Sequence, residues 1–114
     1  MHIERILDRD ATMFSFEFFP PGSDQGWKSL KDRLHRFESM SPSFVSVTYG
    51  AGGNTRDRTH ELVLHLATDT SLDPIPHLTC VGHDAGEIDE ILSAYTGAGI
   101  DNILALRGDA PLSG

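Results

Sequence analysis

The chain has 114 residues and a formal net charge of −8, with 9 lysine and arginine residues against 17 aspartate and glutamate residues. This length suits one domain spanning residues 1–114, and 39% hydrophobic with 23% charged residues is an ordinary globular composition. The acidic balance argues against a nucleic-acid or anionic-membrane surface, because phosphate binding needs clustered positive charge. It still allows one phosphate-bearing ligand held by backbone N–H groups and a single arginine.

The lack of a recognisable targeting signal and the low cysteine content lead us to expect a cytoplasmic protein. Residues 1–11 carry charges throughout, so we expect no signal peptide. No apolar run approaches the roughly 18 residues of a membrane helix. A single cysteine, Cys80, excludes an internal disulfide and mildly favours the cytosol.

Hydrophobic periodicity predicts strands that alternate with amphipathic helices. The first strand ends at Pro20-Pro21-Gly22, Ser41-Pro42 stops the next helix, and Asp84 with Glu87 resembles a capping box. In chain order we expect a short helix or capping segment over 1–11, a strand over 13–19, a helix over 25–39, a strand over 44–49, a helix over 55–68, a strand over 75–81, a helix over 84–97 and a strand over 102–106.

This order is β-α-β-α-β-α-β, with near-continuously apolar strands, as a parallel sheet covered by helices requires. Strands recur about every thirty residues, which is the spacing of a (β/α)8 TIM barrel. The predicted fold class is therefore α/β, with about four βα units forming the N-terminal half of such a barrel. A half barrel has two open edges and should be marginal or associate. The alternative is a small open α/β sheet, complete in itself, with helices on both faces.

The segment FSFEFFPP, residues 14–21, contains one carboxylate, Glu17, among four phenylalanines. It is typical of a buried strand that stops abruptly. Desolvation in such a place would raise the pKa of a carboxylate, and an acid that keeps its proton near neutral pH can act as a general acid. From this segment alone, the alternative is equally open: Glu17 lies on the solvent side of a half-buried strand.

Polar side chains follow the ends of all four predicted strands, where parallel sheets bind their ligands. They are Glu17, the run Thr48-Tyr49-Gly50-Ala51, His77 to Thr79, and Arg107-Gly108-Asp109. Each also has a purely structural explanation: sheet pairing for Thr48, a core position for His77, and a surface ion pair for Arg107 with Asp109. Their convergence on one rim favours a site.

Several familiar motifs are absent. The run GAGGNT, residues 50–55, lacks the third glycine of a dinucleotide fingerprint and the Gly-Lys pair of a P-loop, although its glycines allow close approach of a phosphate or flat ring. Six histidines without an HExxH pattern argue against a zinc site. The tripeptide Arg107-Gly108-Asp109 spells an adhesion motif, which we interpret as coincidence.

Four motifs in order, FSFEFFPP, FVSVTYGAGGNTRDRTHEL, PHLTC and ILALRGDAP, resemble the N-terminal half of methylenetetrahydrofolate reductase. The resemblance covers nearly the whole chain from about residue 13. It implies a flavoprotein barrel that uses FAD to pass a hydride from NAD(P)H to methylenetetrahydrofolate, giving methyltetrahydrofolate for methionine synthesis. It further implies a homo-oligomer at full length, and half a site here, because the family's barrel needs four more strands.

The resemblance also implies roles for individual residues. Glu17 would be the general acid that helps to open the folate ring, and Asp109 would lie between flavin and folate and steady positive charge on the substrate. The FAD-binding residues would be Thr48, Tyr49, Gly50, Ala51, His77, Leu106, Arg107, Gly108 and Asp109. The rival hypothesis is a small non-catalytic α/β module or truncated remnant that binds a partner or a nucleotide.

Overall fold

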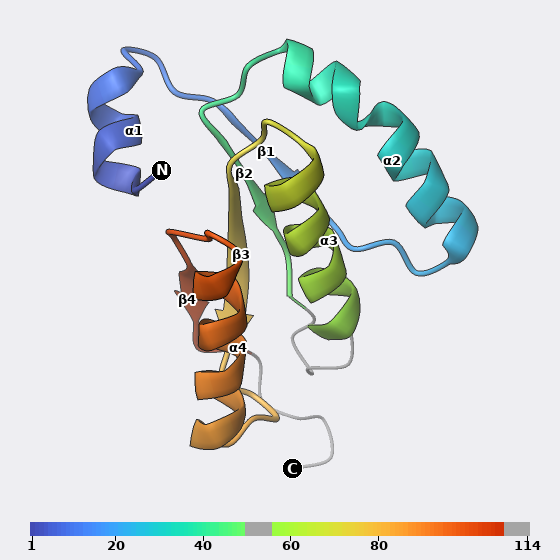
Figure 1. Ribbon diagram of the computed structural model, residues 1–114, viewed down its shortest axis with the longest axis vertical. Coiled ribbons are helices and arrows are strands. Elements are labelled where there is room, and N and C mark those ends of the chain that lie inside the picture. Colours follow the sequence, from blue (N-terminus) through green and yellow to red (C-terminus); the bar gives the residue numbers. More distant parts are fainter. Residues whose placement is uncertain (50–55, 109–114) are drawn as a thin grey trace.

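The computed structural model describes residues 1–49 and 56–108, in which helices and strands alternate (Figure 1). The elements are α1 (Ile3–Arg9), β1 (Ser15–Phe18), α2 (Asp24–Ser39), β2 (Phe44–Val47), α3 (Arg56–Asp69), β3 (Pro74–Thr79), α4 (Ala85–Gly97) and β4 (Leu104–Leu106). No helix in these two ranges is long and apolar enough to cross a membrane.

Every predicted element is present, but the strands are shorter than their apolar runs. β4 begins at Leu104 rather than at residue 102, because Asn102 is bonded to α1: its Oδ1 accepts from the N–H of Ile3 and its Nδ2 donates to the carbonyl of Met1. The predicted cap of α4 is confirmed, since the carboxylate of Asp84 accepts from the N–H of Glu87 at 2.8 Å.

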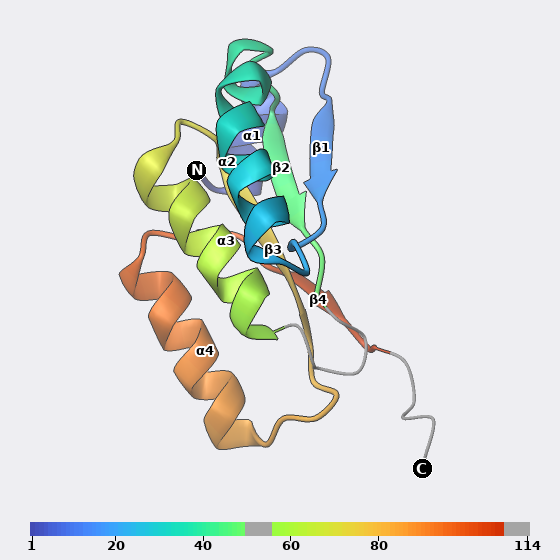
Figure 2. The same ribbon diagram turned by 90° about the vertical axis from the view of Figure 1, so that its right-hand side faces the viewer.

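The four strands are parallel and lie in the order β1-β2-β3-β4. Helices α2, α3 and α4, which connect them, all lie on one side of the sheet (Figure 2). A doubly wound sheet would carry helices on both faces, whereas a barrel wall carries them only outside. The α/β fold predicted from the sequence, half of a (β/α)8 barrel, is therefore confirmed, and the open two-faced sheet is not observed.

The hydrophobic core lies between the sheet and these three helices. From β2, Val45 and Val47 are completely buried, and they pack against Leu62 and Leu66 of α3. The apolar faces that helical spacing predicts are confirmed as parts of this core: Trp27, Leu30, Leu34 and Phe37 on α2, and Leu62, Val63 and Leu66 on α3. On α4, helical spacing predicts a buried stripe of Ile88, Ile91, Leu92 and Tyr95. This prediction was wrong for Leu92, which is exposed, whereas Tyr95 is buried.

Helix α1 lies at the N-terminal ends of the strands. The Met1 ammonium is 2.9 Å from carboxylate oxygens of both Asp73 and Asp101, which precede β3 and β4. The Arg9 guanidinium donates to the carbonyl of Ser43, just before β2. Asp73 and, to a lesser degree, Asp101 raise the pKa of the Met1 amine. These contacts attach α1 to the end of the sheet opposite the predicted site.

The sheet face turned away from the helices is uncovered in these residues. All three residues of β4 are exposed, and Leu104 and Leu106 keep 45% and 40% of their surface in contact with water. Beyond the ends of β1, Phe14 and Phe19 are likewise exposed. Exposed apolar strands at a sheet edge promote association between chains.

We therefore expect the isolated 114-residue chain to self-associate, because none of the described residues covers this face or the edges of the sheet. Size-exclusion chromatography should show species larger than a monomer. Replacing both Leu104 and Leu106 by lysine should shift the chain toward monomer, whereas the same change at the exposed helix residues Ser93 and Thr96 should not. A cooperatively melting monomer of the unmodified chain would contradict this expectation.

Candidate functional site

The uncovered sheet face forms a hollow of about 560 Å³ above α1. The strands contribute inward-facing side chains of alternate residues, and α1 and the segment before β4 complete the walls. The lining residues are Ile3, Glu17, Phe44, Ser46, Ile75, His77, Asp101, Asn102, Ile103 and Leu104. This is the face that would line the interior of a closed barrel.

Three polar side chains meet in this hollow, one from each of the first three strands. The Ser46 hydroxyl donates to Oε1 of Glu17 at 3.3 Å, and Nε2 of His77 lies 3.3 Å from the same oxygen. Strand register explains the grouping, because Glu17 pairs with Ser46 across β1 and β2. The structure thus brings together Glu17 and His77, two residues predicted from the sequence.

The environment of Glu17 differs from the sequence prediction of a buried strand. Strand β1 alternates, so Phe16 and Phe18 turn to the core side and contact Phe37, while Glu17 points to the opposite face. Its side chain is 49% exposed, against 12% for His77. The solvent-side alternative therefore describes β1 in this chain, because no described residue covers the inner face.

Thr48 and Tyr49 follow β2 but point to opposite faces. The backbone of Thr48 is fully engaged: its N–H donates to the Phe18 carbonyl at 3.0 Å, and its carbonyl accepts from the Thr59 hydroxyl at 2.9 Å. Strand alternation places its side chain on the face of Ser46 and Glu17. Tyr49 is buried, and its hydroxyl is bonded to His83 on the helix side, so its side chain does not line the hollow.

At the ends of β3 and β4 the structure provides a close backbone approach. Gly108 has a φ of +81°, and a Cβ there would lie 2.6 Å from the Val81 side chain and 3.1 Å from that of Thr79. The Thr79 hydroxyl is buried and has no hydrogen-bond partner among the described residues. The close approach requires a glycine at position 108, because its backbone packs on the side chains of Val81 and Thr79. The unpartnered Thr79 hydroxyl is the group here that fits a ligand with polar edges, such as a flavin.

Other predicted site residues are not brought into this group. Leu106 and Arg107 are exposed. Gly50, Ala51 and Asp109 lie outside the described residues. In residues 1–49 and 56–108, no three histidine, cysteine, aspartate or glutamate side chains converge in a way that could hold a metal ion.

Sequence reasoning missed a polar network behind the end of β2. A hydrogen bond joins the Tyr49 hydroxyl to Nε2 of His83, and Nδ1 of His83 lies 3.1 Å from a Glu87 carboxylate oxygen. The His83 side chain is 1% exposed. On the same side, Nδ1 of His60 bonds the Tyr95 hydroxyl at 2.6 Å, and burial raises the pKa of Tyr95. In the sequence, the four-residue spacing of His83 and Glu87 could have indicated that their side chains interact.

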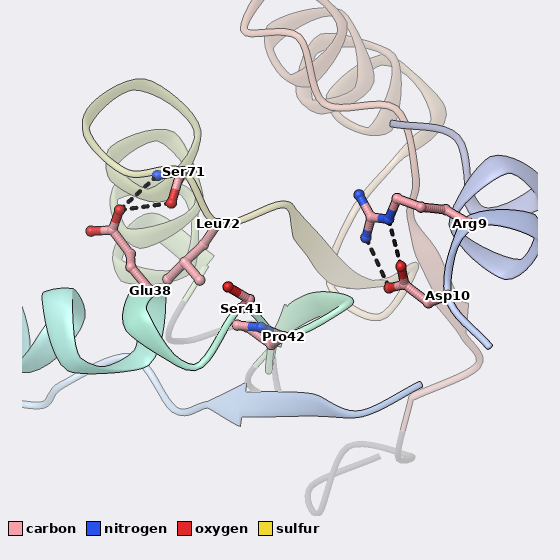
Figure 3. A pocket seen from close by; sticks show the side chains of 7 residues that line it. All are labelled: Arg9, Asp10, Glu38, Ser41, Pro42, Ser71 and Leu72. Atoms are coloured by element: carbon pink, nitrogen blue, oxygen red, sulfur yellow. Dashed lines mark hydrogen bonds and ion pairs between the residues drawn. The ribbon is translucent and has the colours of Figure 1, made fainter. Parts of the chain in front are cut away.

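A second hollow, of about 310 Å³, lies at the N-terminal ends of the strands (Figure 3). Its charged groups are already paired: Arg9 with Asp10 at 2.7 Å, and Glu38 with the N–H and hydroxyl of Ser71. Arg9 lowers the pKa of Asp10 to about 2. This hollow lies at the end of the sheet where parallel α/β proteins do not place their active sites.

Comparison with known proteins agrees with the geometry. The family model "Methylenetetrahydrofolate reductase" matches residues 2–114. This chain belongs to the methylenetetrahydrofolate reductase family. It is 44% identical over 100 residues to the 5,10-methylenetetrahydrofolate reductase of Pectobacterium carotovorum subsp. carotovorum, and 44% identical over 97 residues to that of Escherichia coli (strain K12). It is 39% identical over 109 residues to methylenetetrahydrofolate reductase (NADH) 1 of Arabidopsis thaliana.

The matches cover most of this chain but a minor part of each relative. They span 88%, 85% and 96% of the chain, and 34%, 33% and 18% of the three relatives in the same order. The chain thus spans about a third of the length of its bacterial relatives. We call this chain, continued to the length of such a bacterial reductase, the family-length protein.

Replacing Gly108 by alanine should destabilise the family-length protein by about 2–4 kcal/mol, because the new Cβ combines a positive φ with overpacking against Val81. Urea unfolding measures the change. Gly97→Ala is the matched control: it lies in α4, its Cβ would meet nothing within 4 Å, and it should be neutral or slightly stabilising. Equal effects of the two changes would contradict this prediction.

A double-mutant cycle tests the network behind β2. Tyr49→Phe and His83→Ala should show a coupling free energy of about 1–2 kcal/mol, because each removes one partner of a buried hydrogen bond. Urea unfolding of the two single variants and the double variant gives this value. Strictly additive losses would show that the bond contributes nothing to stability.

Proposed function

We propose that this chain forms the N-terminal half of the barrel of an FAD-dependent methylenetetrahydrofolate reductase, which reduces 5,10-methylenetetrahydrofolate to 5-methyltetrahydrofolate with NAD(P)H. On this proposal residues 1–114 are part of one barrel domain. One observation carries the proposal: a carboxylate, Glu17, stands on the inner face of a family-matched barrel wall, contacted by Ser46 and His77.

Glu17 supplies the proton for the folate. Opening the five-membered ring of methylenetetrahydrofolate requires a proton on a weakly basic ring nitrogen, and a carboxylic acid within hydrogen-bond reach delivers it. In the chain as described, Glu17 is half exposed. Closure of the barrel and arrival of the pterin would remove water from the hollow, and exclusion of water favours the protonated acid.

Asp109 stabilises the cation that follows ring opening. It comes directly after Gly108, whose backbone packs against the end of β3. An anionic side chain near a developing iminium ion lowers the energy of the transition state, and such electrostatic terms are commonly the largest in catalysis. Glu17 and Asp109 thus have different roles, proton donor and fixed negative charge.

The FAD site follows the ends of β2, β3 and β4. The residues that would hold the flavin are Thr48, Tyr49, Gly50, Ala51, His77, Leu106, Arg107, Gly108 and Asp109. FAD, when bound, accepts a hydride from the reduced nicotinamide and donates it to the substrate. The inward-facing Thr48 and the unused hydroxyl of Thr79 support this placement.

Further features of the proposal concern the whole protein. We expect it to be cytoplasmic, to take part in one-carbon and methionine metabolism, and to form a homo-oligomer. The name of the Arabidopsis relative specifies NADH, whereas the names of the bacterial relatives do not specify a nicotinamide. The acidic composition continues to argue against nucleic acid or a membrane surface as a partner.

The test is Glu17→Gln in the family-length protein. Flavin binding and flavin reduction by NADH or NADPH should remain, because neither needs this proton. Reduction of methylenetetrahydrofolate should fall by about 10²–10⁴-fold, the usual contribution of a general acid. Stopped-flow absorbance of the flavin follows the two half-reactions separately.

The matched control is Glu90→Gln, which removes a carboxylate from the exposed surface of α4 and should leave both half-reactions unchanged. If folate reduction in Glu17→Gln equalled that of the control, Glu17 would not be the acid.

A further inference from the structure

The two contacts of Glu17 fall on one of its two carboxylate oxygens. Both the Ser46 hydroxyl and Nε2 of His77 approach Oε1 at 3.3 Å, and Oε2 has no partner among the described residues. We propose that Ser46 and His77 are positioning residues that hold Glu17 by Oε1 and thereby direct Oε2, which carries the proton, toward the substrate. This inference rests on the proposed function of Glu17.

The strand geometry shows why these two residues reach the same atom. Glu17 is on β1 and His77 on β3, so β2 lies between them; neighbouring strands are about 4.8 Å apart, which separates β1 from β3 by nearly 10 Å. On β2, Ser46 pairs with Glu17 on one side and with Ile75 on the other, so His77 lies two residues further along β3 and reaches Glu17 diagonally across β2. A small side chain at Ser46 is compatible with this contact across β2, and its hydroxyl adds a donor.

The exposed fractions of the two side chains indicate that His77 positions Glu17 and not the reverse. The His77 side chain is only 12% exposed, whereas that of Glu17 is 49% exposed. A side chain held on most sides has few alternative rotamers, so His77 provides the fixed point and Glu17 is the side chain that is oriented.

The arrangement favours the proton-transfer step itself. When Glu17 donates, its Oε2–H bond breaks, an N–H bond forms on the folate, and the electron pair stays on the carboxylate. The new negative charge is shared by Oε1, where the two donors already point. Hydrogen bonds to an ionised acceptor are roughly twice as strong as those to a neutral one, so both contacts strengthen as the proton leaves. Water then returns a proton to the carboxylate.

Other charged groups in the hollow do not replace this pair. Asp101 also lines it, but its carboxylate is 2.9 Å from the Met1 ammonium, which lowers its pKa. Among the described lining residues, the remaining titratable side chains are Glu17 and His77 themselves. The contact geometry at Oε1 is therefore set by Ser46 and His77.

Substitutions at Ser46 give the sharpest kinetic test, performed in the family-length protein loaded with FAD. Ser46→Ala should slow the folate half-reaction roughly 10-fold, about the effect of one hydrogen bond to a charged group, and leave flavin reduction unchanged. Ser46→Thr keeps the hydroxyl and should restore the rate. Ser93→Ala, on the exposed surface of α4, is the control.

Substitutions at His77 are judged per bound flavin, because this residue also belongs to the proposed flavin site. His77→Gln keeps an N–H donor at similar reach and should retain more of the folate half-reaction than His77→Leu. Equal rates for the two variants would contradict a donor role for the imidazole.

A second measurement needs no turnover. In the apoprotein labelled with ¹⁵N-histidine, the Nε2 resonance of His77 should move in Glu17→Gln and in Ser46→Val, whose larger side chain blocks the path across β2, but not in Glu90→Gln. If Glu17→Gln abolishes folate reduction while Ser46→Ala keeps its full rate and the His77 resonance stays fixed, the positioning roles are wrong and the proposed function stands. If Glu17→Gln retains folate reduction, the proposed function fails instead.

Discussion

Burial of one sheet face against α2, α3 and α4 is the constraint on which the rest of this structure depends. Because successive side chains of a strand point to opposite faces, packing Val45 and Val47 into the core forces Ser46 and Thr48 to the other side. The same rule applies to Phe16, Glu17 and Phe18 on β1. The polar residues of the candidate site are thus placed by the apolar residues between them.

The two ends of the sheet are specialised in opposite ways. At the N-terminal ends of the strands, the Met1 ammonium, Arg9 and Asn102 bind α1 to the segments that precede β2, β3 and β4. At the C-terminal ends, the Thr79 hydroxyl stays unused within the described chain and Gly108 brings its backbone close to β3. Hydrogen bonds completed within the chain stabilise the fold, whereas a buried hydroxyl without a partner leaves a hydrogen bond that a ligand can complete.

The sequence indicated much of the site but not its orientation. Strand ends and family motifs identified Glu17, Thr48, His77 and Gly108 as rim residues. They did not show that Tyr49 turns to the helix layer and bonds His83, because that requires the relative positions of β2 and α4. Nor did they show the approach of Ser46 and His77 to one oxygen of Glu17, which depends on register across three strands.

By itself the sequence determined the order of helices and strands, the apolar faces of α2 and α3, the α/β class and the family, because periodicity and local motifs are properties of neighbouring residues. Only the tertiary structure decided that all three connecting helices lie on one side, that β1 alternates rather than being buried on both faces, and that Glu17 is half exposed. These features depend on what covers each face of the sheet, and that is set by contacts between residues far apart in the chain.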